Sequence, residues 1–333
     1  MHFKKVVGIL IVSVIFTSIV TGVGFYYAVH IPIVNQSIVS VDIEKGDSFN
    51  RIIEKLREQG LPIQPFLFKL LALSNNSYKK IKTGEYQFDK GLNLQGILSQ
   101  LVQGKTKRYG ITFPEGWTFK QMLQKIASNP SLQHTLPAMN DPAFTAKLGL
   151  EYSHPEGGFF PDTYFFDKQT TDVALLKRAQ LKMQTILQQE WQNKADNLPF
   201  KTPYEALILA SIVEKETAAS EERPKIAGVF IERLNQAMPL QTDPTVIYGM
   251  GDSYAGDIKS KDLLTVTPYN TYVIKGLPPT PIAMPGRAAI SAVLHPERGH
   301  WLYFVARGDG THVFSSTLAE HNAAVETYQR NKP

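Results

Sequence analysis

The longest run of hydrophobic positions lies at the start of the chain, where Lys4 and Lys5 precede an uncharged stretch from Val6 to Val29. A helix needs about 20 apolar residues to cross a bilayer, so this run predicts a transmembrane helix over residues 6–29. A cleaved signal peptide would have a shorter apolar core. The two lysines predict a cytoplasmic tail over residues 1–5 and an exported remainder, because positively charged flanks stay inside.

Three later segments repeat one pattern, in which a strand-like alternation leads to a glycine, a polar residue that can cap a helix and a short amphipathic helix. The first copy follows the alternation Ser37–Ile43 and runs from Gly46 to Ser48 and on into helical spacing. The other copies are Gly91-Leu92-Asn93-Leu94 and Gly116-Trp117-Thr118-Phe119. The first copy resembles the opening of a LysM module, a small fold that binds N-acetylglucosamine polymers. Any strand-turn-helix junction shares this pattern, so both interpretations of residues 35–140 stay open.

The pattern changes near residue 140, and a second domain is expected over residues 141–333. Its first part is irregular and aromatic, with Glu156-Gly157-Gly158-Phe159-Phe160-Pro161-Asp162-Thr163-Tyr164 at its centre. Apolar positions at helical spacing then predict a helix from about Thr171 to Gln192. The expected fold class is therefore α+β, with a transmembrane helix, small LysM-like α/β units and a mixed α+β catalytic domain.

The best-marked helix begins at Thr202-Pro203-Tyr204-Glu205, which combines a capping residue, a proline in the first turn and a capping-box glutamate. Residues 206–213 are apolar except for one serine, so this helix should lie in the interior. Its end brings Glu214 and Glu216 to the edge of that interior. Helical spacing places Leu209, Ile212 and Val213 beside Glu216, and an apolar surround raises a carboxyl pKa, as a general acid requires.

Taken alone, Glu214-Lys215-Glu216 is also what a solvated, charged helix end looks like. The downstream loops favour a functional interpretation, because they are dense in amide, hydroxyl and aromatic groups that suit a sugar-binding cleft. These loops are Leu240-Gln241-Thr242-Asp243-Pro244-Thr245-Val246-Ile247-Tyr248-Gly249, Thr267-Pro268-Tyr269-Asn270-Thr271-Tyr272, Gly276-Leu277-Pro278-Pro279 and Ile282-Ala283-Met284-Pro285-Gly286.

Composition narrows the function further. The 35 basic and 30 acidic residues give a net charge of +5 that is spread along the chain, without the basic and aromatic cluster of a nucleic-acid groove. The absence of cysteine excludes thiolate metal sites and cysteine nucleophiles. The eight histidines show no metal-ligand spacing on a helix, so no metal and no cofactor are expected.

Together, the anchor, the Glu156–Tyr164 segment, the Ile212-Val213-Glu214-Lys215-Glu216-Thr217 helix end and the proline-rich loops resemble the MltG (YceG-like) family of murein transglycosylases. This resemblance implies an endolytic lytic transglycosylase that cleaves the MurNAc-GlcNAc bond and leaves 1,6-anhydro-MurNAc ends. It maps the catalytic glutamate onto Glu216, with Thr217 in the place of the serine of a Glu-Ser pair. It also implies the bacterial inner membrane, with the catalytic domain in the periplasm, peptidoglycan glycan strands as substrate and the penicillin-binding synthases as partners.

A single carboxyl group can act first as acid and then as base in such a reaction, whereas a hydrolase usually needs a second carboxylate. The candidates for a second carboxylate are Asp243, Glu156 and Asp162, and Glu156 is expected near the cleft. Candidates for holding substrate are Thr217, Gln241, Thr242, Asp243, Tyr248, Asn270, Tyr272 and Glu156. Two alternatives remain: a membrane-anchored glycan-binding scaffold without catalysis, and a muramidase that uses water.

Overall fold

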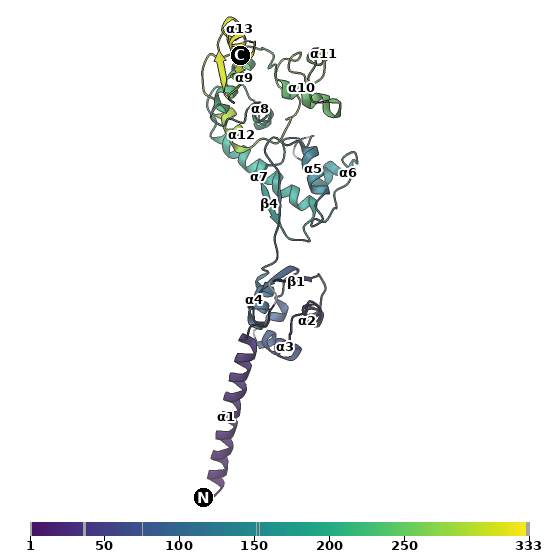
Figure 1. Ribbon diagram of the computed structural model, residues 1–333, viewed down its shortest axis with the longest axis vertical. Coiled ribbons are helices and arrows are strands. Elements are labelled where there is room, and N and C mark those ends of the chain that lie inside the picture. The colour runs from purple at the N-terminus through teal and green to yellow at the C-terminus, as the bar shows by residue number, and fades with distance from the viewer. Residues whose placement is uncertain (1, 36–37, 75, 151, 153, 331–333) are drawn as a thin grey trace. The chain divides into compact units, whose positions relative to one another are not determined.

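The computed structural model describes residues 2–35, 38–74, 76–150, 152 and 154–330, and it has the mixed α+β character that the sequence predicts (Figure 1). Contacts between Cα atoms divide the chain into two compact units. The first comprises residues 1–109 with 165–170, and the second comprises residues 110–164 with 171–333. This division falls earlier than the boundary expected near residue 140, and segment 110–140 belongs to the second unit.

The first unit contains the long amino-terminal helix and a small α/β fold. Its elements are α1 (His2–His30), β1 (Ile38–Ile43), α2 (Phe49–Glu58), α3 (Pro65–Ser74), η1 (Ser77–Lys79), β2 (Gly84–Asp89) and α4 (Leu94–Gln103). Strands β1 and β2 pair antiparallel, with Val41 opposite Tyr86. The predicted strand start at Ser37 lies outside the described residues.

Each of the three predicted strand-turn-helix copies forms in the structure. In every copy the glycine has a positive φ, between 74° and 100°, which suits a residue without a Cβ. Ser48, Asn93 and Thr118 are the N-caps of α2, α4 and α5 (Phe119–Ala127), and each side chain accepts a hydrogen bond from the backbone N–H three residues later. The third copy lies in the second unit, so the repeated pattern marks a local junction and not one type of domain.

The second unit is mainly helical. Its elements are β3 (Tyr109–Thr112), α5 (Phe119–Ala127), α6 (Ala143–Leu148), β4 (Thr163–Phe166), α7 (Asp172–Gln192), α8 (Pro203–Glu216), α9 (Arg223–Asn235), α10 (Asp243–Met250), η2 (Gly251–Ser253), α11 (Ser260–Leu264), α12 (Arg287–Leu294), β5 (Tyr303–Ala306), β6 (His312–Ser315), α13 (Leu318–Val325) and η3 (Glu326–Arg330). Strand β3 pairs with β4, β5 pairs antiparallel with β6, and the division between the two units falls within β3 and β4.

Helix α8 is the centre of the second unit, as its apolar sequence predicts. Residues 206–213 are all buried, and α7, α9, α10 and α12 pack against the helix. The one hydroxyl in this stretch, on Ser211, donates to the Ile208 carbonyl oxygen and accepts the Ile282 N–H, so its burial leaves no unpaired polar group. The predicted start is also confirmed, because the Thr202 side chain accepts the Glu205 N–H. The carboxyl end of α8 therefore emerges from a buried, apolar core.

Candidate active site

Glu216 is the last residue of α8, and its side chain lines an open cleft of about 630 Å³ in the second unit. The Thr242 hydroxyl donates a hydrogen bond to the Glu216 carboxylate. Burial raises the pKa of Glu216, and the negative charge of Asp243 raises it further, while the Thr242 hydrogen bond and the charge of His312 oppose the shift. The net effect is a carboxyl group that keeps its proton to higher pH than an exposed glutamate.

Glu214, the other glutamate of the pair, has a different environment. Its carboxylate pairs with Arg223 on α9 at 3.0 Å and accepts the Gly286 N–H at 2.9 Å. Only 5% of the Glu214 side chain is exposed. Since both oxygens are bound to protein, Glu214 joins three helices and presents no free oxygen to a substrate. In the sequence, Glu214 and Glu216 differ only in the residues beside them on the helix. In the structure they also differ in their hydrogen-bond and ion-pair partners.

The cleft around Glu216 is built from segments far apart in the sequence. Its lining comes from the end of α8, from α9, from the 240–243 segment, from Tyr272, from β5 and β6, and from α13 and η3. The lining residues are Glu216, Arg233, Leu240, Gln241, Thr242, Asp243, Tyr272, Tyr303, Phe304, Val305, Ala306, His312, Leu318, His321, Asn322, Val325 and Gln329.

One wall of the cleft is the 240–243 segment, which is held by buried polar contacts. Arg233 donates to the Leu240 carbonyl oxygen at 2.9 Å and to the Gln241 side-chain oxygen at 3.2 Å. Thr271 accepts the Thr242 N–H, and its carbonyl accepts the Gln241 N–H. Gln241 has a φ of 55°, an uncommon conformation for a residue with a side chain, and these contacts hold it there.

Asp243 and Tyr272 lie side by side on the same wall. The Tyr272 hydroxyl donates to the Asp243 carboxylate at 2.7 Å. Burial and this carboxylate both raise the pKa of Tyr272, so the phenol stays protonated and remains a donor. Asp243 opens α10, with Thr242 as its N-cap residue and Pro244 in the first turn. Four predicted substrate contacts, Gln241, Thr242, Asp243 and Tyr272, therefore share the cleft with Glu216.

The other predicted contacts do not line this cleft. Glu156 is buried, with 3% of its surface exposed, and accepts the Phe119 N–H at 2.9 Å and the Tyr248 hydroxyl at 3.1 Å. Burial raises the pKa of Glu156 to about 7. Asp162 pairs with Lys182. Through these contacts the buried Glu156 and the half-buried Tyr248 join α10 to the start of α5.

The side chains of Asn270 and Thr217 also form hydrogen bonds within the protein. The Asn270 amide group donates to the carbonyl oxygens of Asp262, Leu263 and Thr265, and its oxygen accepts the Tyr272 N–H. Thr217 is buried and accepts the Ala219 N–H. Asn270 thus shapes the loop that carries Tyr272, and Thr217 shapes the turn after α8.

A model of the YceG-like family matches residues 41–327. The chain belongs to the YceG-like family. This YceG-like chain is 32% identical over 320 residues to the endolytic murein transglycosylase of Bacillus subtilis, with 90% of this chain and 87% of that protein covered. It is 29% identical to the endolytic murein transglycosylase of Streptococcus pneumoniae, of whose length it spans 60%.

A crystal structure of a YceG-like protein from Listeria monocytogenes has a similar fold. The TM-score is 0.56 at 29% identity, and the match covers 86% of the YceG-like chain and 98% of the Listeria chain. The family predicted from the motifs is therefore confirmed by sequence and by structure.

Sequence reasoning missed the carboxyl-terminal side of the cleft. His312 contacts Glu222 at 2.6 Å through Nδ1, and its backbone N–H donates to the same carboxylate. His321 stacks on Tyr303, and its Nδ1 has no partner among the described residues; burial and the nearby Arg233 charge lower its pKa. The only signal in the sequence was a histidine and aromatic enrichment after residue 295. Across the described ranges, no three histidines or carboxylates are grouped as a metal site would need.

Proposed function

We propose that this YceG-like chain is an endolytic lytic transglycosylase, a lyase that cleaves the MurNAc-GlcNAc bond within peptidoglycan strands and leaves 1,6-anhydro-MurNAc ends. The observation that supports this most directly is the state of Glu216. It lines an open cleft, its pKa is raised by burial, and no ion-pair partner contacts it within the described part of the chain. The names of the Bacillus and Streptococcus relatives support the same reaction class.

In the first proposed step, protonated Glu216 donates its proton to the glycosidic oxygen while the bond from that oxygen to C1 of the muramic residue breaks. The leaving sugar departs with a new hydroxyl group, and positive charge develops on C1 and the ring oxygen. In the second step the Glu216 carboxylate takes the proton from the muramic 6-hydroxyl, whose oxygen bonds to C1 and closes the anhydro ring. The carboxyl group ends protonated, so the cycle consumes no water.

The other residues of the cleft fit supporting roles in this reaction. The Asp243 carboxylate offers negative charge to the developing cation, and it also helps Glu216 to keep its proton. Gln241 and Tyr272 offer amide and hydroxyl groups to sugar substituents. The remaining predicted residues do not line the cleft and stabilise the segments around it through the hydrogen bonds described above; they are Thr217, Glu156, Tyr248 and Asn270.

A muramidase is the second candidate function, because Asp243 lies in the same cleft as Glu216 and could activate a water molecule. A glycan-binding scaffold without catalysis is the third. All three are separated by one digest, in which the purified full chain in detergent is incubated with glycan strands and the fragments are analysed by mass spectrometry. Anhydro ends support the lyase, reducing ends support the muramidase, and intact strands support the scaffold.

The assignment of the acid is tested in the same digest with matched glutamine variants. Glu216→Gln should bind strands and lose cleavage by about a thousandfold, the middle of the range for loss of a general acid. Glu214→Gln is the control, and it should still cut at a temperature at which it is folded. If Glu214→Gln is inactive while folded and Glu216→Gln still cuts, the assignment to Glu216 is wrong.

Helix α1 is proposed to anchor the enzyme in the bacterial inner membrane as a single span. Among the described residues, one helix is long and apolar enough to cross a bilayer, Lys5–His30. The lysines at its start favour an amino terminus in the cytoplasm and a catalytic unit in the periplasm. Cutting close to the membrane would act on strands as they are made, so we propose the penicillin-binding synthases as partners and termination of strand elongation as the role.

A further inference from the structure

Helix α3, in the first unit, is apolar on both of its faces. Phe68, Leu71 and Ala72 point into the core of the unit. On the opposite face, Phe66, Leu70 and Leu73 follow one another at spacings of four and three residues and are 75%, 44% and 60% exposed. Single exposed apolar residues are ordinary, whereas an exposed helical stripe of three large ones indicates a contact surface.

This stripe lies next to the end of the candidate membrane span. Helices α1 and α3 are in contact (Figure 1). Val29 of α1 is buried in the same core as Phe68, with Phe25 packed against this core. The segment directly after α1 is hydrogen-bonded to the rest of the unit. The Ile33 N–H donates to the Leu92 carbonyl oxygen, and the Asn93 side-chain amide donates to the His30 carbonyl oxygen. The folded part of the unit is therefore attached to α1 without a flexible linker.

The length of α1 places α3 at the level of the membrane surface. The 26 residues of the span measure about 39 Å at 1.5 Å per residue, which exceeds the hydrocarbon thickness of about 30 Å. The last turns of α1 therefore emerge into the interface, where Tyr26 and Tyr27 suit the headgroup region. An element in contact with these turns is held within reach of the same leaflet.

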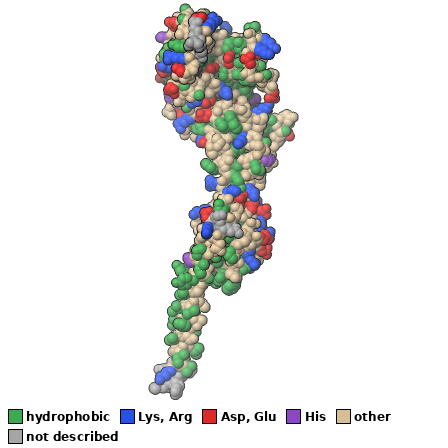
Figure 2. All heavy atoms as spheres, in the orientation of Figure 1, with side chains coloured by type: hydrophobic (Ala, Val, Ile, Leu, Met, Phe, Trp, Pro, Cys, Tyr) green, Lys and Arg blue, Asp and Glu red, His purple; other side chains and the backbone are tan. Residues whose placement is uncertain are grey.

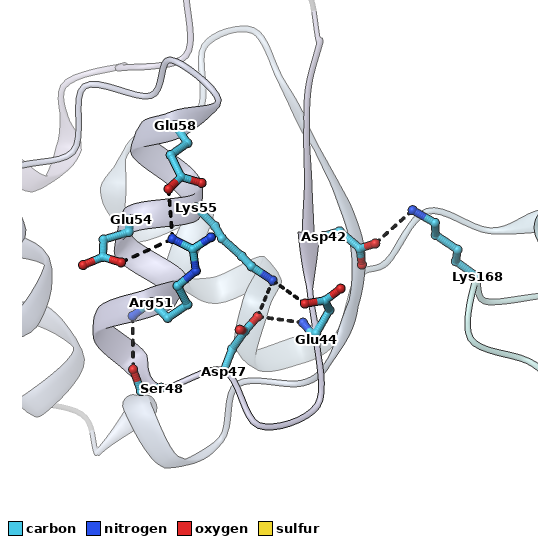
Figure 3. Close-up of polar contacts among 9 residues, drawn as sticks. All are labelled: Asp42, Glu44, Asp47, Ser48, Arg51, Glu54, Lys55, Glu58 and Lys168. Carbon is cyan, nitrogen blue, oxygen red and sulfur yellow. Dashed lines mark hydrogen bonds and ion pairs between the residues drawn. The ribbon is translucent and has the colours of Figure 1, made fainter.

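The distribution of charged side chains on the first unit agrees with a position of α3 at the membrane surface. Helix α3 has no acidic residue and carries the exposed Lys69, and the exposed Lys79 and Lys80 lie at the end of the adjoining η1 segment and directly after it. Acidic side chains concentrate instead on α2 and the turn before it, where Glu54 and Glu58 pair with Arg51, and Glu44 and Asp47 pair with Lys55 (Figure 3). In the space-filling view, the hydrophobic surface of α1 continues onto the adjoining side of the unit (Figure 2).

From these observations we propose that α3 is an interfacial membrane helix, and that Phe66, Leu70 and Leu73 insert into the outer leaflet beside α1 with Lys69, Lys79 and Lys80 at the anionic headgroups. The proposal rests on the proposed anchoring by α1. It gives the first unit a role of its own, which is to hold this unit on the bilayer surface beside α1. A lone span permits rotation and tilt, whereas a second contact beside it restricts both.

The absence of cysteine makes this surface testable in the full chain, because each introduced cysteine is the only labelling site. Leu70→Cys and Leu73→Cys would each carry an environment-sensitive fluorophore in vesicles of phosphatidylethanolamine and phosphatidylglycerol. The quenchers would be lipids with a spin label high on the acyl chain and, separately, aqueous iodide. Lys45→Cys, in the exposed turn between β1 and α2, is the matched control, and Ile15→Cys reports on the span itself.

The expected result is strong loss of fluorescence with spin-labelled lipid at Leu70 and Leu73, weak loss with iodide, and the reverse pattern at Lys45. Quenching by lipid at Ile15 but not at Leu70 and Leu73 would overturn the proposal and leave the anchor in place. Protection of Leu70 and Leu73 from both quenchers would mean that protein covers the stripe, which also overturns it. Absence of lipid quenching at Ile15 would refute the anchor separately.

Discussion

At the scale of single residues, three glutamates near α8 and α10 differ in their burial and in their hydrogen-bond partners. Glu216 is half-buried and accepts one hydrogen bond, Glu214 is fully paired, and Glu156 is buried with two neutral donors. Burial raises the pKa in all three, but only Glu216 also faces the cleft. We therefore propose Glu216 as the acid on its access combined with its desolvation, because desolvation alone does not distinguish it from Glu214 and Glu156.

Thr242 should set the alkaline limit of activity. Its hydrogen bond stabilises the ionised form of Glu216, so removing it in Thr242→Val raises the pKa of Glu216 further. Because the first step needs the protonated acid, activity is lost as pH rises through that pKa. The alkaline limb of the rate against pH should therefore move to higher pH in Thr242→Val, while Thr242→Ser should keep the profile of the parent. A shift of the limb to lower pH would contradict this role.

Glu156 should make the protein less stable as pH rises. Its pKa is 4.5 in an exposed setting and about 7 in the fold, so stability is fully present below the unfolded value and is lost as pH rises through the folded one. The difference corresponds to about 3 kcal/mol. Glu156→Gln can keep both contacts, because its oxygen can accept the Phe119 N–H and its amide can donate to Tyr248. Thermal unfolding of this variant should change less between pH 4.5 and pH 7 than that of the parent, and an unchanged slope would refute the assignment.

At the scale of elements, the cleft depends on how the end of α8 is joined to its neighbours. Glu214 pairs with Arg223 at the start of α9 and accepts the N–H of Gly286, the N-cap residue of α12. One side chain thus fixes three helices at the point where Glu216 enters the cleft. Gly286 also lies against Glu115, because a Cβ at position 286 would overlap the Glu115 carboxylate.

Glu214→Gln should lower the free energy of unfolding by about 3 kcal/mol, since it leaves the buried Arg223 charge without its partner. Replacing both members, as in Glu214→Leu with Arg223→Met, should recover part of that loss because no unpaired charge remains. Denaturant unfolding of the two variants and the parent measures both effects. If the single variant proves as stable as the parent, the ion pair does not hold the helices together.

At the scale of the whole molecule, one chain combines a candidate membrane span, a small α/β unit and a helical unit that holds the cleft. The amino-terminal lysines should orient the span with residues after His30 outside the cytoplasm. Protease added to intact spheroplasts should therefore degrade a carboxyl-terminal tag on the full chain and spare an amino-terminal tag. The opposite result would reverse the proposed orientation and remove peptidoglycan as an accessible substrate.

The sequence by itself determined the features that depend on residues a few positions apart. The span follows from an unbroken apolar run, the three junctions from a glycine and a capping side chain, and the burial of α8 from a stretch without charge. The family was also readable from motifs in their order along the chain, and the match to residues 41–327 confirms it. Each of these features depends on neighbouring residues or on the order of motifs along the chain, so it can be recognised without knowledge of the fold.

Tertiary structure alone decided which predicted residues meet. It brought Gln241, Thr242, Asp243 and Tyr272 to Glu216, and it placed Glu156 and Tyr248 together outside the lining of that cleft. It also added His312 and His321, which lie about a hundred residues beyond Glu216 and show no spacing rule. A cleft is formed by long-range packing, and helical periodicity predicts the face on which a side chain lies but not the distant segment that the face meets.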